Sequence, residues 1–237
     1  MCREKNECSE LGRNPDNWDQ ECPLRPPAWI DHEINIFAEA LDMFIQRDRE
    51  ACLQLLATIR DNEITEWYIE HGQMSGRHRK NALGLPKPDL ISEDLRDPLR
   101  SPQKYQEAVF NRDNYHCRYC GSRLVSQKLM RSFSKVLNSD RFKKGPTNLT
   151  THGIIHATWP VADHVVPWNM GGRTILDNCV TSCGACNYGK DGYTCEQIGI
   201  SDPFERPPVI DGWDGLVSRI TDVHEIEAGV AGISPRI

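Results

Sequence analysis

The residues best suited to chemistry lie between positions 161 and 190 of the 237-residue chain. Asp163 and His164 are adjacent, and Asn187 directly follows a C-x-x-C pair. Hydrolysis of a phosphodiester needs a base that activates water, a cation that neutralises developing charge, and a geometry that aligns them. Histidine is a suitable base, and carboxylate and amide oxygens are ligands that Mg²⁺ prefers. We therefore expect His164 to be the base, and Asp163 and Asn187 to hold Mg²⁺ or, alternatively, Mn²⁺ or Ni²⁺.

Asn178 is a further candidate because it lies on a segment that should return beside His164. Its amide can hydrogen-bond across to the His164 region and orient the ring. An isolated Asp-His pair is usually structural. A structural role accounts poorly, however, for the asparagines and paired cysteines that accompany this pair in one short stretch.

Four cysteines form two C-x-x-C pairs, Cys117 with Cys120 and Cys183 with Cys186. Two residues between paired cysteines let one turn present both sulfurs to a single ion, and zinc prefers tetrahedral thiolate and imidazole ligands. Four protein ligands leave no position for water. We therefore expect a structural Zn²⁺ rather than a catalytic one.

Other arrangements of these cysteines stay open. The pairs can be redox-active or simply buried thiols, and His152 and His156 can join the first pair in a mixed site. The zinc spacing favours a reducing compartment over a secreted disulfide framework. No run of eighteen apolar residues and no signal peptide occurs, so we expect a cytoplasmic protein with no membrane partner.

The formal net charge of −6 counts against a nucleic-acid partner only at first sight. Residues 104–190 carry 12 Lys and Arg against 5 Asp and Glu, so the one basic segment surrounds the candidate site. A local basic patch is what phosphate contacts need, although such a run can also be a solvated helix face. The candidate nucleic-acid-binding residues are Arg123, Lys128, Arg131, Lys135, Lys143, Lys144 and Lys190.

Apolar residues at helical spacing predict an N-terminal helical region. They recur at steps of three and four: Ile30, Ile34, Phe37, Ala38, Leu41 and Ile45. Two more helices are expected at 48–59 and 61–71, the latter ending at Gly72. The apolar face of the first helix belongs to the core of the chain or, alternatively, forms a homodimer surface.

The chain divides into an irregular lead-in (1–27), a helical region with a proline-rich extended segment at 73–100 (28–100), a catalytic domain with a basic insert at 121–160 (101–200), and an acidic tail (201–237). Within the catalytic domain we expect a helix from Ser101 to Phe110, a helix at 126–137, a strand at 159–166, a Gly-Gly turn, a second strand at 174–180 and a helix from about Cys183. In the tail, residues 212–216 are expected to pack back onto the domain.

These motifs resemble those of the HNH endonuclease family. The matching stretches are R-D-N-Y-H-C-R-Y-C-G at 112–121, D-H-V-V-P-W-N-M-G-G at 163–172, D-N-C at 177–179 and C-G-A-C-N-Y-G-K-D-G at 183–192. The resemblance implies an α+β fold with a ββα-metal finger stapled by a four-cysteine zinc. It also implies that His164 is the general base, that Asn178 orients it, and that Asp163 and Asn187 ligate the divalent ion.

The leading hypothesis is thus a metal-dependent endonuclease acting on DNA, most simply double-stranded DNA, with RNA or branched DNA as alternatives. The rival hypothesis is a catalytically inactive, zinc-dependent nucleic-acid-binding or adaptor module. One finger holds one cleavage site, so a monomer should nick its substrate and a double-strand cutter should dimerise. Fold-level resemblance does not decide the biological role.

Overall fold

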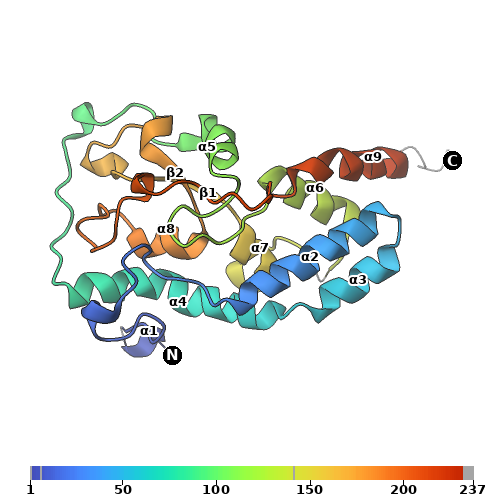
Figure 1. Ribbon diagram of the computed structural model, residues 1–237, viewed down its shortest axis with the longest axis horizontal. Helices are drawn as coiled ribbons and strands as arrows, with labels where there is room; N and C mark the ends of the chain where they lie inside the picture. The colour runs from blue at the N-terminus through green and yellow to red at the C-terminus, as the bar shows by residue number, and fades with distance from the viewer. Residues whose placement is uncertain (1, 6, 141, 232–237) are drawn as a thin grey trace.

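Helices dominate the part of the chain that the computed structural model describes, which is residues 2–5, 7–140 and 142–231 (Figure 1). The α-helices in this part are α1 (Cys2–Lys5), α2 (Trp29–Ile45), α3 (Arg49–Thr58), α4 (Asp61–Ala82), α5 (Gln106–Arg112), α6 (Gln127–Leu137), α7 (Gly153–Thr158), α8 (Gly184–Lys190) and α9 (Ile220–Ala231). They surround an antiparallel sheet of two strands, β1 (Val161–His164) and β2 (Cys179–Ser182). The mixed helix-and-sheet composition agrees with the α+β prediction. No helix in these ranges is long and apolar enough to cross a membrane.

The N-terminal helices pack directly on the segment that carries the candidate site. α4 lies along α7 and α8 (Figure 1). At this crossing a Cβ on Gly76 would lie 2.8 Å from Tyr188 O and 3.0 Å from Gly189 O, so only glycine allows so close an approach. The predicted helix end at Gly72 is therefore wrong, because contact with α8 carries α4 on to Ala82. We call residues 83–100, which follow α4, the connector.

The apolar face of α2 is buried inside the chain, which is the first of the two alternatives expected for it. Its Phe37 stacks on Phe142 with ring centres 5.5 Å apart and meets the edge of Phe133 at 5.8 Å. Phe133 belongs to α6, whose first turn is capped by the Ser126 hydroxyl accepting from Leu129 N. The insert helix is thus confirmed, and the buried face of α2 is closed to a dimer partner.

The two strands pair with Val161 opposite Ser182 and His164 opposite Cys179. The prediction of a strand at 174–180 is wrong in position, since residues 176–178 form a 3-10 turn before β2 begins. The polar side chains in the segment before β2 form hydrogen bonds within the loop, so this segment does not continue the strand. Gly172 lies where this loop closes, and a Cβ there would come 1.8 Å from Val166 O.

The tail contains a helix that the sequence did not reveal. α9 packs against α6 through buried Val223 and Ile226. Residues before α9 return to the domain as expected, with Trp213 Nε1 donating to Leu124 O at 2.7 Å. α7, which ends just before β1, was also missed, because six residues show too little periodicity.

Candidate functional site

The four paired cysteines meet at one point, as predicted. Their sulfur atoms all lie within 4.8 Å of one another, and all four side chains are buried. The first pair lies in the turn after α5, and the second pair begins α8, where Cys183 caps the helix. No other group of three or more possible metal ligands occurs in the part of the chain that the structure describes.

The alternative with two histidines does not form. His156 Nε2 contacts Asn148 O at 2.8 Å, and His152 Nδ1 accepts from Ile154 N at 3.3 Å. Both rings therefore have partners in their own segment. The set of four cysteines remains, and it fits a structural metal because four sulfur ligands match the tetrahedral preference of zinc.

The protonation of the cluster also fits a cation. Burial alone would raise the pKa of Cys117, but hydrogen bonds from the other three thiols lower it well below its ordinary value. Hydrogen bonds with Cys117 and Cys120 raise the pKa of Cys183, and burial chiefly raises that of Cys186. A divalent ion would let all four act as thiolates.

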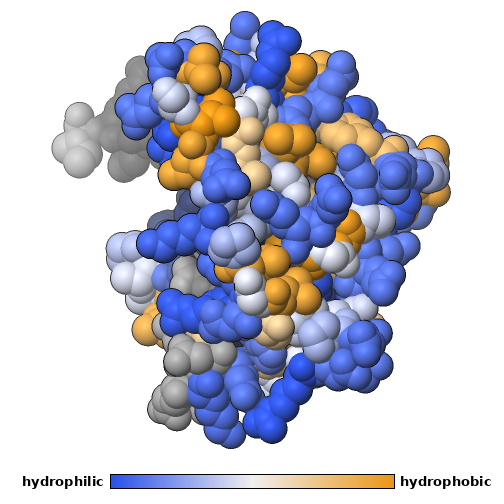
Figure 2. Space-filling view, turned by 90° about the vertical axis from the view of Figure 1, so that its left-hand side faces the viewer, coloured by the Kyte–Doolittle hydropathy of each residue, from blue (hydrophilic) through white to orange (hydrophobic). Residues whose placement is uncertain are grey.

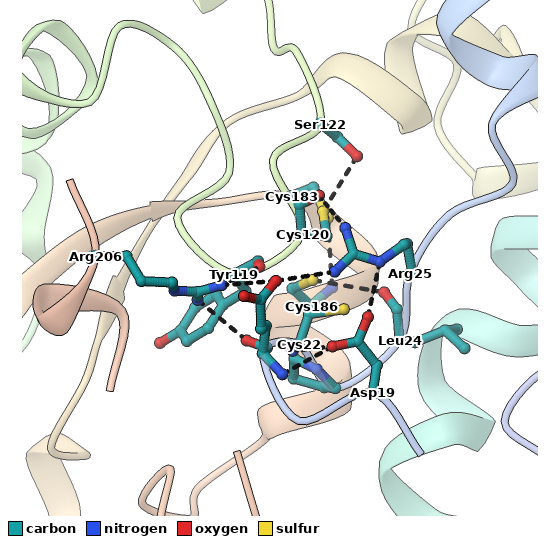
Figure 3. Close-up of polar contacts among 12 residues, drawn as sticks. Asp19, Cys22, Leu24, Arg25, Tyr119, Cys120, Ser122, Cys183, Cys186 and Arg206 are labelled. Atoms are coloured by element: carbon teal, nitrogen blue, oxygen red, sulfur yellow. Dashed lines mark hydrogen bonds and ion pairs between the residues drawn. The ribbon is translucent and has the colours of Figure 1, made fainter. Parts of the chain in front are cut away.

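The N-terminal lead-in, residues 1–27, covers this cluster (Figure 3). Cys186 Sγ donates to Leu24 O at 3.6 Å, and Arg25 donates from Nη1 to Cys120 O at 2.8 Å. Asp19 holds the same guanidinium at 2.7 Å. Cys22 is fully buried and hydrogen-bonds Cys186. The spacing of these residues does not indicate such a contact, because the contacting residues lie more than 90 positions apart in the sequence.

His164 stands at the end of β1, and its ring is fixed by Thr174. His164 Nε2 lies 2.9 Å from Thr174 Oγ1, and that hydroxyl donates its only proton to Leu99 O. The threonine oxygen must therefore accept from Nε2–H. Nδ1 is left with the lone pair, which is the form a general base needs.

The pKa of His164 is lowered from its ordinary value, chiefly by burial and also by the positive charge of Lys190. Asp163 and Asp97 act in the opposite direction but do not outweigh burial. The ring is consequently neutral near pH 7. A neutral imidazole can accept a proton from water.

Asp163 lies beside His164 and is held by two neighbours. Tyr119 donates its hydroxyl to Asp163 Oδ2 at 2.7 Å, and the ammonium of Lys190 lies 3.3 Å from the same oxygen. Burial raises the pKa of Tyr119 well above its ordinary value, and the Asp163 charge adds to this, so the phenol stays a donor.

Lys190 was expected to contact nucleic acid, but its side chain is bonded to groups of the protein itself. Its side chain is 1% exposed, and Nζ donates to His164 O at 2.7 Å. The ammonium thus joins the end of α8 to the end of β1. It neutralises Asp163, and both side chains line the same cleft.

The two asparagines have different surroundings. Asn178 binds backbone on both sides of the loop, accepting from Val166 N at 2.9 Å and donating to Val166 O at 3.0 Å and to Arg173 O at 2.9 Å. It orders the loop that brings Thr174 to the histidine, but the direct ring contact belongs to Thr174. Asn187 is half-buried, and its amide has no hydrogen-bond partner among the residues that the structure describes.

Asp163, His164 and Asn187 line one cleft of about 540 Å³. Arg96 and Arg100 of the connector and Trp168 line it too, and none of these three was predicted. A larger pocket of about 900 Å³ lies at the N-terminal segment and contains none of the predicted site residues.

The basic residues of the insert lie outside this cleft. Lys128, Arg131, Lys135, Lys143 and Lys144 are exposed. Arg131 and Lys144 lie over the ring of Trp159, at 5.3 and 4.1 Å from its centre, and Lys143 pairs with Asp140 at 3.1 Å.

Arg123 is the insert residue least open to a ligand. It donates from Nε to Asp31 Oδ1 at 2.9 Å, and its guanidinium lies 4.8 Å from the ring centre of Trp213. These contacts tie the turn after the first cysteine pair to α2. We read Arg123 as a structural residue rather than the phosphate contact that we expected.

Comparison with known proteins gives one match. No curated protein and no solved structure matches the chain significantly. A family model described as HNH endonuclease matches residues 160–191, the span that contains β1, β2 and α8. Residues 160–191 therefore carry the motif of the HNH endonuclease family, as the sequence resemblance implied, and this indicates nuclease-type activity.

Proposed function

We propose that the protein is a metal-dependent endonuclease that hydrolyses DNA phosphodiester bonds, with His164 as the general base. The hydrogen bond between His164 Nε2 and Thr174 Oγ1 carries this proposal. It commits one ring nitrogen and leaves Nδ1 to take a proton from the attacking water. The lowered pKa of the ring supports the same role, because the neutral form is the active one.

Asp163 and Asn187 are proposed to hold the divalent ion, Mg²⁺ first and Mn²⁺ or Ni²⁺ as substitutes. Both line the cleft that His164 enters, and two protein oxygens suit an ion that keeps several waters. When bound, the ion would neutralise charge that develops on the phosphate and the leaving oxygen. Tyr119 and Lys190 hold the Asp163 carboxylate in place for this task.

The four cysteines are proposed to hold Zn²⁺ and to position the site rather than to react. Cys186 immediately precedes Asn187 on α8, so a metal at the cluster would fix the amide in the cleft. The turn after α5 carries Cys120, and next to it Tyr119 reaches Asp163. One structural ion would thus order two groups of the catalytic site.

The direct experiment is digestion of supercoiled plasmid with purified protein in Mg²⁺, Mn²⁺ or Ni²⁺, followed by mapping of the ends. We expect nicking by the wild type and loss of nicking in His164→Ala, with zinc content unchanged. His32→Ala is the matched control, because His32 is exposed on α2, and α2 contributes no residue to the cleft.

A panel of duplex DNA, branched DNA and RNA would identify the preferred substrate in the same assay. Wild-type protein that leaves every member intact with all three metals would overturn the proposal. That result would favour a zinc-dependent binding or adaptor module.

A further inference from the structure

The connector completes the cleft, although it lies outside the segment that matches the HNH family. It is hydrogen-bonded at two places to the loop between β1 and β2. Ile91 N donates to Asn169 O at 3.1 Å, and Trp168 Nε1 donates to Asp97 O at 2.7 Å. Asp97 Oδ2 accepts from Thr174 N at 2.9 Å. The connector is therefore held in place beside the histidine.

Two arginines of the connector face this cleft next to one aromatic ring. The guanidinium carbons of Arg96 and Arg100 lie 5.2 and 5.1 Å from the ring centre of Trp168. Arg96 is also fixed by donation from Nε and Nη2 to Ile91 O, at 3.0 and 2.8 Å. Stacking on a tryptophan restrains a guanidinium while its N–H groups remain available to a ligand.

Arg100 differs from Arg96 in having no carboxylate partner within the described residues. Its side chain is exposed and lies over the ring of Trp168. Arg96 is 14% exposed and pairs with Glu93 at 3.6 Å. Arg100 thus brings an unneutralised positive charge to the rim of a cleft in which Asp163 is already matched by Lys190.

We infer that Arg100, braced by Trp168 and backed by Arg96, binds a backbone phosphate of the nucleic acid next to the one that is cut. This inference rests on the proposed function and names the phosphate-binding surface of the same site. A guanidinium matches two phosphate oxygens at once, and a stacked one loses little freedom on binding. Figure 2 views the side on which the connector runs, where hydrophilic side chains alternate with smaller hydrophobic patches.

The insert offers a competing surface with similar chemistry. Arg131 lies over Trp159 at 5.3 Å, much as Arg100 lies over Trp168, but Arg131 is not part of the cleft. Its Nη2 also donates to Gln127 at 3.0 Å. Comparison of these two arginines separates binding at the catalytic cleft from binding by the basic insert.

The test measures binding of a labelled duplex DNA oligonucleotide by the His164→Ala protein over a series of salt concentrations. Each lost phosphate contact reduces the slope of log K against log salt by about 0.9. We expect Arg100→Gln to show this reduction and to weaken binding about tenfold. Arg100→Lys should retain the slope, because the charge remains. Arg47→Gln, at an exposed position between α2 and α3, removes the same charge and should change neither quantity.

Arg131→Gln is the rival arm of the same experiment. A lowered slope in Arg131→Gln with an unchanged slope in Arg100→Gln would overturn the inference and assign binding to the insert. Thermal unfolding of each variant shows whether the connector stays folded. If the connector unfolds in Arg100→Gln, Arg100→Lys still tests the inference.

Cleavage by proteins with His164 intact separates this inference from the proposed function. We expect Arg100→Gln to raise KM about tenfold with a smaller change in kcat, since the contact exists before the reaction. A wild type that cuts while Arg100→Gln cuts with the same KM leaves the nuclease in place and removes the role of Arg100. A wild type that cuts nothing removes the proposed function itself.

Discussion

The four-cysteine cluster and the cleft beside it differ in how their polar groups are satisfied, although α8 supplies residues to both. The cysteines are buried, contact one another and are covered by the lead-in at Leu24 and Arg25. The cleft is open, and Asn187 in it has no partner among the described residues. A closed site adds stability, whereas an open site keeps groups ready for a ligand. Substitutions in the two regions should therefore have opposite signatures.

The largest effect is expected from Cys183→Ser. Loss of one thiolate should release the metal and leave the remaining cysteines as a charged, buried cluster. We expect a loss of at least about 4 kcal/mol in the free energy of unfolding, which lowers Tm by roughly 10 °C. Metal content by mass spectrometry and calorimetry would measure this.

Cys52→Ala provides the control for Cys183→Ser, because Cys52 is a buried thiol on α3 outside the cluster. It should retain the metal and lose only about 1 kcal/mol. A Cys183→Ser protein with full metal content and an unchanged Tm would show that the cluster is not a metal centre.

Asn187→Ala should show the opposite signature. The amide lines the cleft and bonds to nothing in the described structure, so we expect Tm to stay within about 1 °C. Activity should fall about 100-fold and more divalent metal should be needed to reach the plateau. Plasmid nicking across a Mg²⁺ titration measures both quantities.

Asn178→Ala sharpens the same comparison, because this asparagine makes three hydrogen bonds to backbone. Its removal should cost about 2 kcal/mol of stability. Equal losses of Tm in the two variants would contradict the view that the Asn178 side chain is structural and that the Asn187 side chain is free to bind a ligand.

The sequence revealed groups whose spacing is local and missed groups that the fold brings together. The cysteine pairs and Asp163-His164 are close neighbours in the chain, so their chemistry is visible without a structure. Thr174 contacts both the histidine and Leu99 of the connector, and Arg100 lines the same cleft as the histidine. No periodicity in the sequence indicates that the connector returns beside β1. The charge of Lys190 is likewise visible in the sequence, whereas its burial and its ion pair with Asp163 are not.

The positions of the helices and strands were predictable to a similar extent. Apolar spacing located α2 and α6, because a buried helix face repeats every three or four residues. The end of α4 was misplaced because Gly72 resembles a helix stop, whereas the contact at Gly76 depends on α8, more than 100 residues later. Strand β2 was displaced because Thr174 and Asn178 serve the loop and not the sheet.

Thr174→Val tests whether the open site depends on the ring contact. Valine keeps the shape but cannot accept from His164 Nε2, so the tautomer and orientation of the ring are no longer fixed. We expect activity to fall about tenfold with metal content unchanged. Thr174→Ser keeps the hydroxyl and should recover most of the rate, and equal rates in the two variants would contradict the assignment.

The smallest effect concerns pH and follows from the sign of the His164 shift. Burial and Lys190 place the pKa of the ring below 6.5, and a divalent ion at Asp163 would move it in the same direction. Because the neutral ring is the proposed base, activity should fall only when the pH drops through this lowered pKa. At pH 6.5 the single-turnover rate should therefore exceed half of its plateau, whereas an unshifted histidine would give half. Rates measured from pH 5 to 8 at saturating metal test this, and an acid limb centred above pH 6.5 would show that the titrating base is not the half-buried ring of His164.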